Sequence, residues 1–386
     1  TMTRTAFVQI GSAPVYDLGA DHPMSPLRRR LAVDLIEAYG IADQPGVERM
    51  IATSATDAEI ERVHAPAYVK AVRRYSAEPI LASTWEAAQW GLAAGGDTPA
   101  FAGMHEAAAA VCGASLTAAR AVSTGGFEQA FCAGGGLHHA FAHKAAGFCI
   151  YNDCAVAIQA LLDEGAERVA YIDIDVHHGD GTQWIFFEEP RVMTCSVHES
   201  GRYLFPGTGG IVERGVGAAE GTAINIPLPP HAGDRPYLRA IEEVIAPAVM
   251  RFKPDVIVTQ DGADPHHADP LAHLQVTMSA FPTAYRLLHQ LAADAAGGRW
   301  VALGGGGYTY SVVPRAWTLL FAEMVGVELD DEIPAAWWRP GELLAETPLP
   351  RRLSDDPEPE VALDERMRAD LEGDRVVDEA RAVLIR

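Results

Sequence analysis

The sequence predicts an α/β fold class in which a parallel β-sheet is flanked by helices on both faces, and its length fits one large domain or two ordinary ones. From about residue 128 onward, short apolar runs alternate with amphipathic segments, the pattern of strands alternating with helices. The apolar runs also end alike, in Gly, His or Asp. The 386 residues are 48% hydrophobic and 21% charged, so the chain can bury a large core.

Five apolar runs are predicted as strands, because each is short and bounded by charged residues, Gly or Pro. They cover residues 128–133, 168–176, 191–197, 254–260 and 299–305. The amphipathic segments around them predict helices over 153–164, 236–251 and 279–295. Such alternation favours a parallel sheet that is buried on both faces.

The segment before residue 128 predicts helices. Thr56 and Glu59 have capping-box spacing at the start of a helical pattern over 56–74. An Ala-rich stretch predicts a helix over 105–122 that is closed by Gly125 and Gly126. The first hundred residues are therefore predicted to be helical and accessory to the sheet.

The C-terminal tail begins with a linker rich in Pro and Asp and continues as a charged helical pattern. This pattern fits either a docked terminal helix or a frayed appendage. We find no chemistry in the tail, so we predict a catalytic domain over residues 1–350 and a charged helical extension over residues 351–386.

Charge and cysteine usage limit the partners and the compartment. Lys and Arg number 30 against 52 acidic residues, a formal net charge of -22, which opposes direct binding of nucleic acid. The five cysteines form no CxxC pair, which predicts reduced, packed thiols. No signal peptide and no apolar stretch of about 18 residues is apparent, so we expect a cytoplasmic protein without membrane contact.

The five predicted strands are followed by polar endings. These read "GGGLHHA", "HHGDG", "HES", "DGAD" and "GGGGY" in chain order. In open α/β sheets, ligands bind outside the carboxyl ends of the strands. We therefore expect the endings to converge on one crevice.

The ending "YIDIDVHHGDGT", residues 171–182, indicates a metal site. Residues two apart on a strand share a face, so Asp173, Asp175 and His177 project together. Burying them requires a compensating cation or hydrogen-bond partners. Asp175 and His177 offer two ligands, and Asp264, at the end of another apolar run, is the best third. This set suits catalytic Zn²⁺ and could also hold Fe(II).

Two further histidines are rival ligands to this set. His266 and His267 follow Asp264 closely, although their place in a polar loop favours a position in the loop or at the rim of the site. His178 points to the face opposite His177, and we predict only local hydrogen bonds for it.

A second pair, His138 and His139, suggests general acid and base catalysis. Asp173 and Asp180 are spare carboxylates that can each fix the tautomer of one imidazole. Two His–Asp dyads beside a metal-activated water provide a base and an acid for hydrolysis. Tyr308, after four glycines, could donate its hydroxyl to a developing oxyanion.

Taken together, these endings and the motifs "GFCIYND", "FPGTGG" and "DPLAHLQVT" resemble the zinc-dependent histone deacetylase family, closest to its bacterial acetoin-utilisation branch. The resemblance spans about residues 15–325. It implies the arginase/deacetylase fold, a single domain around an eight-stranded parallel sheet. It also places the zinc ligands on Asp175, His177 and Asp264, and the catalytic groups on His138, His139, Tyr308, Asp173 and Asp180.

The resemblance implies three further sets of residues. An acyl-lysine tunnel and its rim would use Asp97, Gly147, Phe148, Phe205, Leu271 and Gly306, although composition alone would favour core packing for the two phenylalanines. A structural K⁺ would be held by Asp173, Ser196 and the carbonyls of Asp175, His177 and Val197. Arg28 resembles the arginine of an internal acetate channel.

The predicted activity is zinc-dependent hydrolysis of ε-N-acetyl-lysine, or of longer acyl-lysine, on a protein or peptide. A deacetylase of small amines such as acetylpolyamines would use the same chemistry and would be favoured by extra acidic residues at a narrow tunnel mouth. An acyl-lysine binder without activity would require the loss of a catalytic group, and none is missing. A binuclear ureohydrolase of the same fold would need more metal-binding aspartates, and Asp261 and Asp269 are the residues to check.

Overall fold

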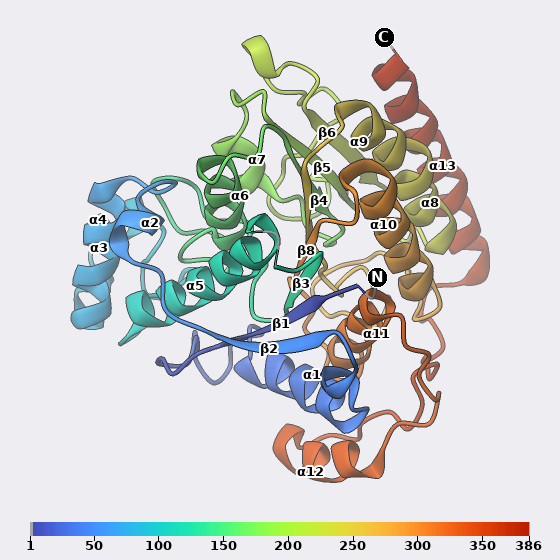
Figure 1. Cartoon of the computed structure of the whole chain (residues 1–386), viewed down its shortest axis with the longest axis horizontal. Helices are drawn as coiled ribbons and strands as arrows, with labels where there is room; N and C mark the ends of the chain where they lie inside the picture. Colours follow the sequence, from blue (N-terminus) through green and yellow to red (C-terminus); the bar gives the residue numbers. More distant parts are fainter. Residues whose placement is uncertain (1–2, 125, 386) are drawn as a thin grey trace.

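Eight parallel strands form one sheet in the computed structural model, which describes residues 3–124 and 126–385 (Figure 1). The strand order is β2-β1-β3-β8-β7-β4-β5-β6. The strands are β1 (Thr5–Ile10), β2 (Val47–Ala52), β3 (Gln129–Cys132), β4 (Val169–Asp173), β5 (Val192–Glu199), β6 (Ala223–Leu228), β7 (Val256–Gln260) and β8 (Trp300–Leu303). The predicted fold class and the eight-stranded parallel sheet are confirmed.

Helices cover both faces of this sheet (Figure 1). One face packs against α5 (Met104–Ser123) and α6 (Asp153–Asp163). The other face packs against α1 (Pro26–Ala38), α8 (Asp234–Arg239), α9 (Ala246–Phe252), α10 (Ala280–Ala296), α11 (Val313–Val325) and α13 (Leu363–Ile385). A π-helical segment, Ala240–Ile245, joins α8 to α9.

The remaining helices lie outside these two layers. Helices α2 (Asp57–Ile60), α3 (Pro66–Ala77) and α4 (Trp85–Gln89) pack around the outer part of α5. Helix α7 (Asp180–Ile185) follows β4, and α12 (Ala335–Ala345) packs against α1. Short 3₁₀ turns lie at Ile41–Asp43, Pro79–Ser83 and Gly217–Ala219.

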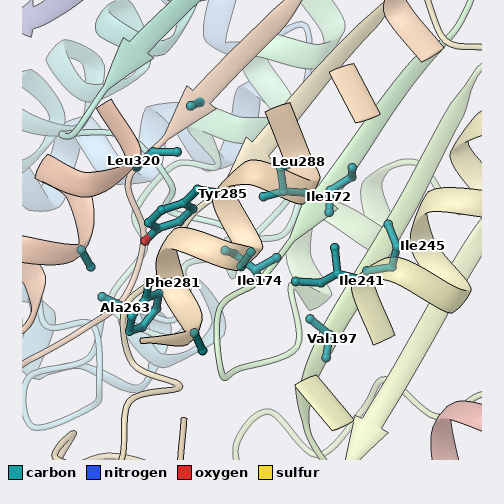
Figure 2. Close-up of a cluster of buried hydrophobic side chains, with 14 of the residues drawn as sticks. Ile172, Ile174, Val197, Ile241, Ile245, Ala263, Phe281, Tyr285, Leu288 and Leu320 are labelled. Atoms are coloured by element: carbon teal, nitrogen blue, oxygen red, sulfur yellow. The ribbon is translucent and has the colours of Figure 1, made fainter. Parts of the chain in front are cut away.

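Alternation along the strands divides the core between the two faces. In β4, Val169 and Tyr171 face the α5/α6 layer, whereas Ala170 and Ile172 face the opposite layer. Figure 2 shows Ile172 in that second layer, near Ile241 of the π-helical segment and Leu288 of α10. The sheet is therefore buried on both sides, and polar groups from its central strands gather at the strand ends.

The five strands predicted from apolar runs correspond to β3, β4, β5, β7 and β8. The helix predicted over 105–122 is α5, which ends at Ser123; Gly125 lies outside the described residues. The capping box is present, because Thr56 Oγ1 accepts from Glu59 N at 3.3 Å and Thr56 N donates to Glu59 Oε2 at 2.8 Å. The pattern over 56–74 forms two helices rather than one, since Pro66 starts α3.

The prediction that the first hundred residues are helical and accessory is wrong in part. Strand β1 lies inside the sheet, between β2 and β3. It has only six residues, and β2 is an edge strand with one buried side chain, so no apolar run marks it. Strand β6 at the other edge also lacks a predicted run; its sequence contains Pro227, which an edge strand tolerates.

The C-terminal helix α13 is docked rather than frayed. Val377 and Ala380 are buried in the core on the α8 to α11 face. Asp374 pairs with Arg235 at 2.6 Å and with Arg239 at 2.8 Å, which ties α13 to α8. The division into a domain over 1–350 and an extension over 351–386 stays a prediction.

The predictions about the cysteines and about membrane-spanning segments can be compared with the structure. All five cysteines are free and buried, as predicted. In the part of the chain that the structure describes, no helix has the length and apolarity needed to cross a bilayer.

Phe7 provides a test of the unexpected internal strand. Its fully buried ring stacks on Phe321 at 4.9 Å and on Phe131 at 6.1 Å between ring centroids. We expect Phe7→Ala to lower the free energy of unfolding by about 3–5 kcal/mol, because it leaves a cavity between β1, β3 and α11. Urea denaturation measures this loss.

Ile51 on the neighbouring edge strand is the matched control. Its side chain is 66% exposed, so Ile51→Ala is expected to change stability by less than about 0.5 kcal/mol. Equal losses in the two variants would contradict the placement of β1 in the core.

Candidate active site

The loops after four neighbouring strands meet at the carboxyl edge of the sheet. Strands β3, β8, β7 and β4 are adjacent in that order. The loop after β3 carries His138 and His139, and the loop after β8 carries Tyr308. The loop after β7 carries Asp264, and the loop after β4 carries Asp175 and His177. Strand adjacency thus brings together residues that are up to 170 positions apart by their numbers, from 138 to 308.

Asp175, His177 and Asp264 form a buried group whose ligand atoms all lie within 4.8 Å of one another. His177 Nδ1 lies 3.1 Å from Asp175 Oδ1 and 3.2 Å from Asp264 Oδ2. Backbone contacts hold the carboxylates: Gly306 N donates to Asp175 Oδ2 at 2.8 Å and Val176 N donates to Asp264 Oδ1 at 2.9 Å. Two oxygens and one nitrogen aimed at one point are a donor set that fits Zn²⁺ or Fe(II).

Glycines keep space around these carboxylates. A Cβ on Gly306 would lie 2.0 Å from Asp264 Oδ2 and 2.7 Å from Asp175 Oδ2, and one on Gly262 would lie 2.3 Å from Asp175 Oδ2. Any side chain at these positions would collide with the ligand atoms. The glycines of "DGAD" and "GGGGY" therefore let the backbone approach the carboxylates closely.

The charges of this group compensate one another only partly. Burial and the charge of Asp175 raise the pKa of Asp264 to about 6. Burial opposes the charge of His177, but hydrogen bonds to Asp175 and Asp264 raise the pKa of this imidazole to about 10. The group thus holds a proton where two carboxylates need positive charge, and a divalent cation would replace that proton.

The paired histidines each face their own carboxylate. His138 Nδ1 donates to Asp173 Oδ2 and His139 Nδ1 donates to Asp180 Oδ1, both at 2.7 Å. These bonds turn the two Nε2 atoms toward each other at 2.9 Å, within hydrogen-bond distance, so a proton on His138 Nε2 is shared with His139 Nε2. The tautomers proposed from the sequence are thus supported by the geometry.

Burial opposes the charge of both rings, but their neighbours move the two pKa values in opposite directions. It opposes the charge of His138, but the carboxylates of Asp173 and Asp175 raise the pKa of His138 to about 9. Burial and the charge of His138 lower the pKa of His139 to about 4, despite Asp180. One ring is therefore protonated and the other neutral near pH 7.

Two residues that the sequence reasoning left without a role support this pair. Asn152 Nδ2 donates to the carbonyls of His138 and Ala140, both at 3.0 Å. Asp153 accepts from Gly136 N at 2.9 Å and from Leu137 N at 2.7 Å. Both residues belong to the motif "GFCIYND", which the sequence analysis singles out. Their contacts to the loop after β3 could not be predicted, because they depend on the fold.

A pocket of about 270 Å³ leads to this centre. Asp97, His139, Gly147, Phe148, His177, Leu204, Phe205, Leu271 and Tyr308 line it. The Phe205 ring lies 5.0 Å from His139 and the Phe148 ring 5.8 Å from Tyr308, between centroids. Phe148 and Phe205 therefore line the pocket, whereas composition alone favoured core packing.

The Phe148 wall is held in an unusual backbone conformation. Phe148 has a φ of 69°, and Gly147 before it approaches His139 so closely that a Cβ there would lie 2.4 Å from the imidazole. Exposed Asp97 accepts from Gly147 N at 3.1 Å, and Tyr16 donates its hydroxyl to the Phe148 carbonyl at 2.7 Å. Exposed Asp97 thus supports the wall, and its role as the rim residue that holds the substrate stays a prediction.

Arg28 is buried behind the loop that carries Tyr308. Its Nη1 donates to the carbonyls of Gly305 at 2.8 Å and Gly307 at 2.9 Å. It also lines a separate cavity of about 90 Å³ together with Tyr16, Met24 and Leu137. The acetate-channel role of Arg28 stays a prediction.

The remaining residues of "YIDIDVHHGDGT" have local partners. His178 Nδ1 lies 2.8 Å from Thr208 Oγ1 and its Nε2 lies 3.0 Å from Gln183 Oε1, so the expected local hydrogen bonds are present. Ser196 pairs with Asp173 in the sheet register, and its Oγ lies 2.7 Å from His198 Nδ1. The K⁺ site, with its carbonyls of Asp175, His177 and Val197, stays a prediction.

The rival ligands form a second cluster. His266 Nε2 and His267 Nε2 lie 3.0 and 2.8 Å from Asp356 Oδ1 in the C-terminal segment. Ala268 N donates to His266 Nδ1 at 3.1 Å, which turns His266 Nε2 toward Asp356. The ligand atoms of His266, His267 and Asp356 lie within 4.8 Å of one another, so this cluster could also hold a metal ion. These histidines join a loop to the tail rather than the main group.

The two aspartates that a binuclear ureohydrolase would need are used elsewhere. Asp261 accepts from Thr259 Oγ1 at 2.6 Å, and Asp269 accepts from Tyr308 N at 2.8 Å. Neither belongs to the Asp175, His177 and Asp264 group. The Asp175, His177 and Asp264 group therefore lacks the further aspartates of a binuclear centre.

An eight-stranded parallel α/β domain whose strand ends carry two His–Asp dyads and a buried Asp₂His group that could hold a metal ion is the arrangement of a class of hydrolases. The chain belongs to the histone deacetylase domain family, whose model matches residues 22–324. The predicted family and its arginase/deacetylase fold are thus confirmed.

Curated relatives place the chain more narrowly within this family. The acetoin utilization protein AcuC of Bacillus subtilis is 43% identical over 337 residues, which cover 87% of this chain and 86% of the relative. AcuC of Staphylococcus xylosus is 36% identical over 364 residues, 94% of this chain and 93% of the relative. AcuC of Staphylococcus aureus strain MSSA476 is 36% identical over 356 residues, 92% and 90% of the two chains.

Gly306 allows a test of the metal site that does not depend on activity. We expect Gly306→Ala to weaken Zn²⁺ binding at least about tenfold, because the new methyl group occupies the space beside both carboxylates. Isothermal titration of metal-stripped protein with Zn²⁺ measures the affinity.

Gly210→Ala is the matched control for this substitution. A Cβ on Gly210 would meet nothing closer than 3.8 Å, so its Zn²⁺ affinity is expected to equal that of the wild type. Unchanged affinity in Gly306→Ala would contradict the assigned metal site.

Proposed function

We propose that this protein is a zinc-dependent lysine deacetylase that hydrolyses ε-N-acetyl-lysine on proteins or peptides, with longer acyl groups as a further substrate class. The observation that carries the proposal is a pocket walled by Phe148 and Phe205 that reaches His139 and His177. An extended lysine side chain is slender and apolar along its stem, so it fits between two aromatic rings. The names of the AcuC relatives, which refer to acetoin utilization, agree with acetyl chemistry.

The metal would be held by Asp175, His177 and Asp264. When bound, Zn²⁺ polarises the scissile carbonyl and lowers the pKa of the attacking water toward about 7. Fe(II) would suit the same donor set. We also propose that a structural K⁺ binds near Asp173 and Ser196.

The histidine pair would move the proton. His139 lines the pocket, and its low pKa keeps it neutral, so its Nε2 accepts the proton of the water. The resulting imidazolium donates a proton to the leaving lysine nitrogen. His138, with its raised pKa, keeps positive charge beside the reaction centre, and Asp173 and Asp180 hold the rings in place.

Tyr308 would stabilise the tetrahedral oxyanion. Its ring lines the pocket, and burial raises the pKa of its phenol well above the usual value. The phenol therefore keeps its proton and can donate a hydrogen bond to the carbonyl oxygen as negative charge develops. Acetate and free lysine are the products.

The pocket lining favours a protein substrate over a small polyamine. Asp97 is the acidic side chain among the lining residues, and Leu271 contributes an apolar wall. A polyamine carries a second ammonium group, which would require further acidic partners at the mouth. The net charge of -22 attracts basic peptides and opposes nucleic acid, and the free cysteines fit a cytoplasmic enzyme.

A substrate panel tests this function. Zn²⁺-loaded protein is expected to release acetate from an acetyl-lysine peptide, with lower kcat/KM for acetylpolyamines; longer acyl-lysine peptides measure chain-length preference. Tyr308→Phe is expected to reduce kcat about 10²- to 10³-fold, because it removes the oxyanion donor. Asp264→Ala is expected to lose Zn²⁺ binding and activity together.

Full activity in Asp264→Ala would contradict the assignment of Asp264 as a metal ligand. A higher kcat/KM for acetylpolyamines than for peptides would replace the proposed substrate class while keeping the chemistry. Fe(II)-loaded protein assayed in parallel compares the two metals.

The pH profile of kcat/KM tests the separate roles proposed for His138, as the protonated ring, and His139, as the neutral base. Asp173 raises the pKa of His138, so Asp173→Asn is expected to move the alkaline limb of kcat/KM to lower pH. Asp180 raises the pKa of His139, so Asp180→Asn is expected to move the acidic limb to lower pH. A shift of either limb toward higher pH contradicts the assignment.

A further inference from the structure

Several hydrogen bonds join the loop after β7 to the loop after β8, and three of them flank Tyr308. Ala263 N donates to the Gly306 carbonyl at 3.0 Å, and Thr309 Oγ1 donates to the Ala268 carbonyl at 3.0 Å. Between them, Tyr308 N donates to Asp269 Oδ2 at 2.8 Å. The position of Tyr308 thus depends on a loop that is nearly forty residues away in the sequence.

Asp269 uses both of its carboxylate oxygens in this region. Oδ2 accepts from Tyr308 N, and Oδ1 accepts from Leu271 N at 2.9 Å. The side chain is buried, with 7% exposure, and lies outside the Asp175, His177 and Asp264 group. One carboxylate therefore connects the backbone of the phenol donor to the backbone of the Leu271 pocket wall.

The chain before Tyr308 cannot orient it alone. Gly307 has a φ of 115°, a conformation that glycine adopts freely among several others. Arg28 Nη1 binds the Gly307 carbonyl at 2.9 Å, and Asp269 is the side chain that binds the backbone N–H of Tyr308 directly after this glycine. A hydrogen bond from a backbone N–H to a buried carboxylate is a strong anchor for the chain.

We infer that Asp269 is a positioning residue that orients Tyr308 toward the scissile carbonyl and holds the Leu271 wall in register with it. This inference rests on the proposed function, because it assumes that Tyr308 stabilises the oxyanion. Asp269 touches neither metal nor substrate in this role. It acts through the two backbone N–H groups that it binds.

Asp269→Asn tests the inference, since an amide offers one acceptor oxygen where the carboxylate offers two. With Zn²⁺-loaded enzyme and an acetyl-lysine peptide, kcat is expected to fall about 10- to 100-fold through misplacement of the phenol. Zn²⁺ content should stay equal to that of the wild type. In a double-mutant cycle, Asp269→Asn should add little to the loss already caused by Tyr308→Phe.

Asp261→Asn is the matched control. Asp261 is also a buried aspartate after β7, but its carboxylate binds Thr259 and contacts no residue of the pocket. It is expected to alter thermal stability while leaving kcat close to the wild-type value. Any effect that it has on kcat should multiply with that of Tyr308→Phe.

If Asp269→Asn does not fold, Asp269→Glu takes its place, because it keeps the charge and displaces the oxygens by one methylene. Unchanged kcat in the folded variant, or losses that multiply fully with Tyr308→Phe, would overturn the inference and leave the proposed function intact. Full activity in Tyr308→Phe alone would overturn both the oxyanion role and the positioning role.

Discussion

The structure depends on the burial of two carboxylates beside one imidazole at the carboxyl edge of the sheet. Asp175 and Asp264 lie within 3.2 Å of His177 Nδ1, and all three side chains are buried. Such a group is stable only when positive charge and hydrogen-bond donors reach it. Gln260 Nε2, at 2.7 Å from Asp175, supplies one such donor, and the close glycines let backbone N–H groups supply others. The group could also hold a metal ion that supplies the positive charge.

The acid–base pair is tied to the same constraint. The negative charge of Asp175 contributes to the raised pKa of His138, and the charge of His138 in turn lowers the pKa of His139. Metal group and histidine pair are therefore one electrostatic system, and their different protonation states arise from it. The pocket reaches this system between aromatic walls that contain few charges.

Much of the site could be predicted because the residue types are costly and concentrated. Asp175, His177, His138 and His139 stand out at strand ends in a chain that otherwise keeps charge out of apolar runs. Predicting Asp264 as the third ligand required the assumption that parallel strands end at one edge of the sheet. The strand order supports this assumption. The supporting contacts of Asn152, Asp153 and Asp269 could not be predicted, since a polar residue in a loop carries no sign of which backbone groups it meets.

The sequence by itself determined the fold class, the five strands with apolar runs, the family and the set of polar residues at the strand ends. These depend on periodicity and residue type, which are local properties. Only the tertiary structure decided that β1 is internal, that α13 is docked, and that His266 and His267 join the tail instead of the metal group. Those outcomes depend on which surfaces meet across long sequence separations, where burial and hydrogen bonding with distant partners outweigh local preference.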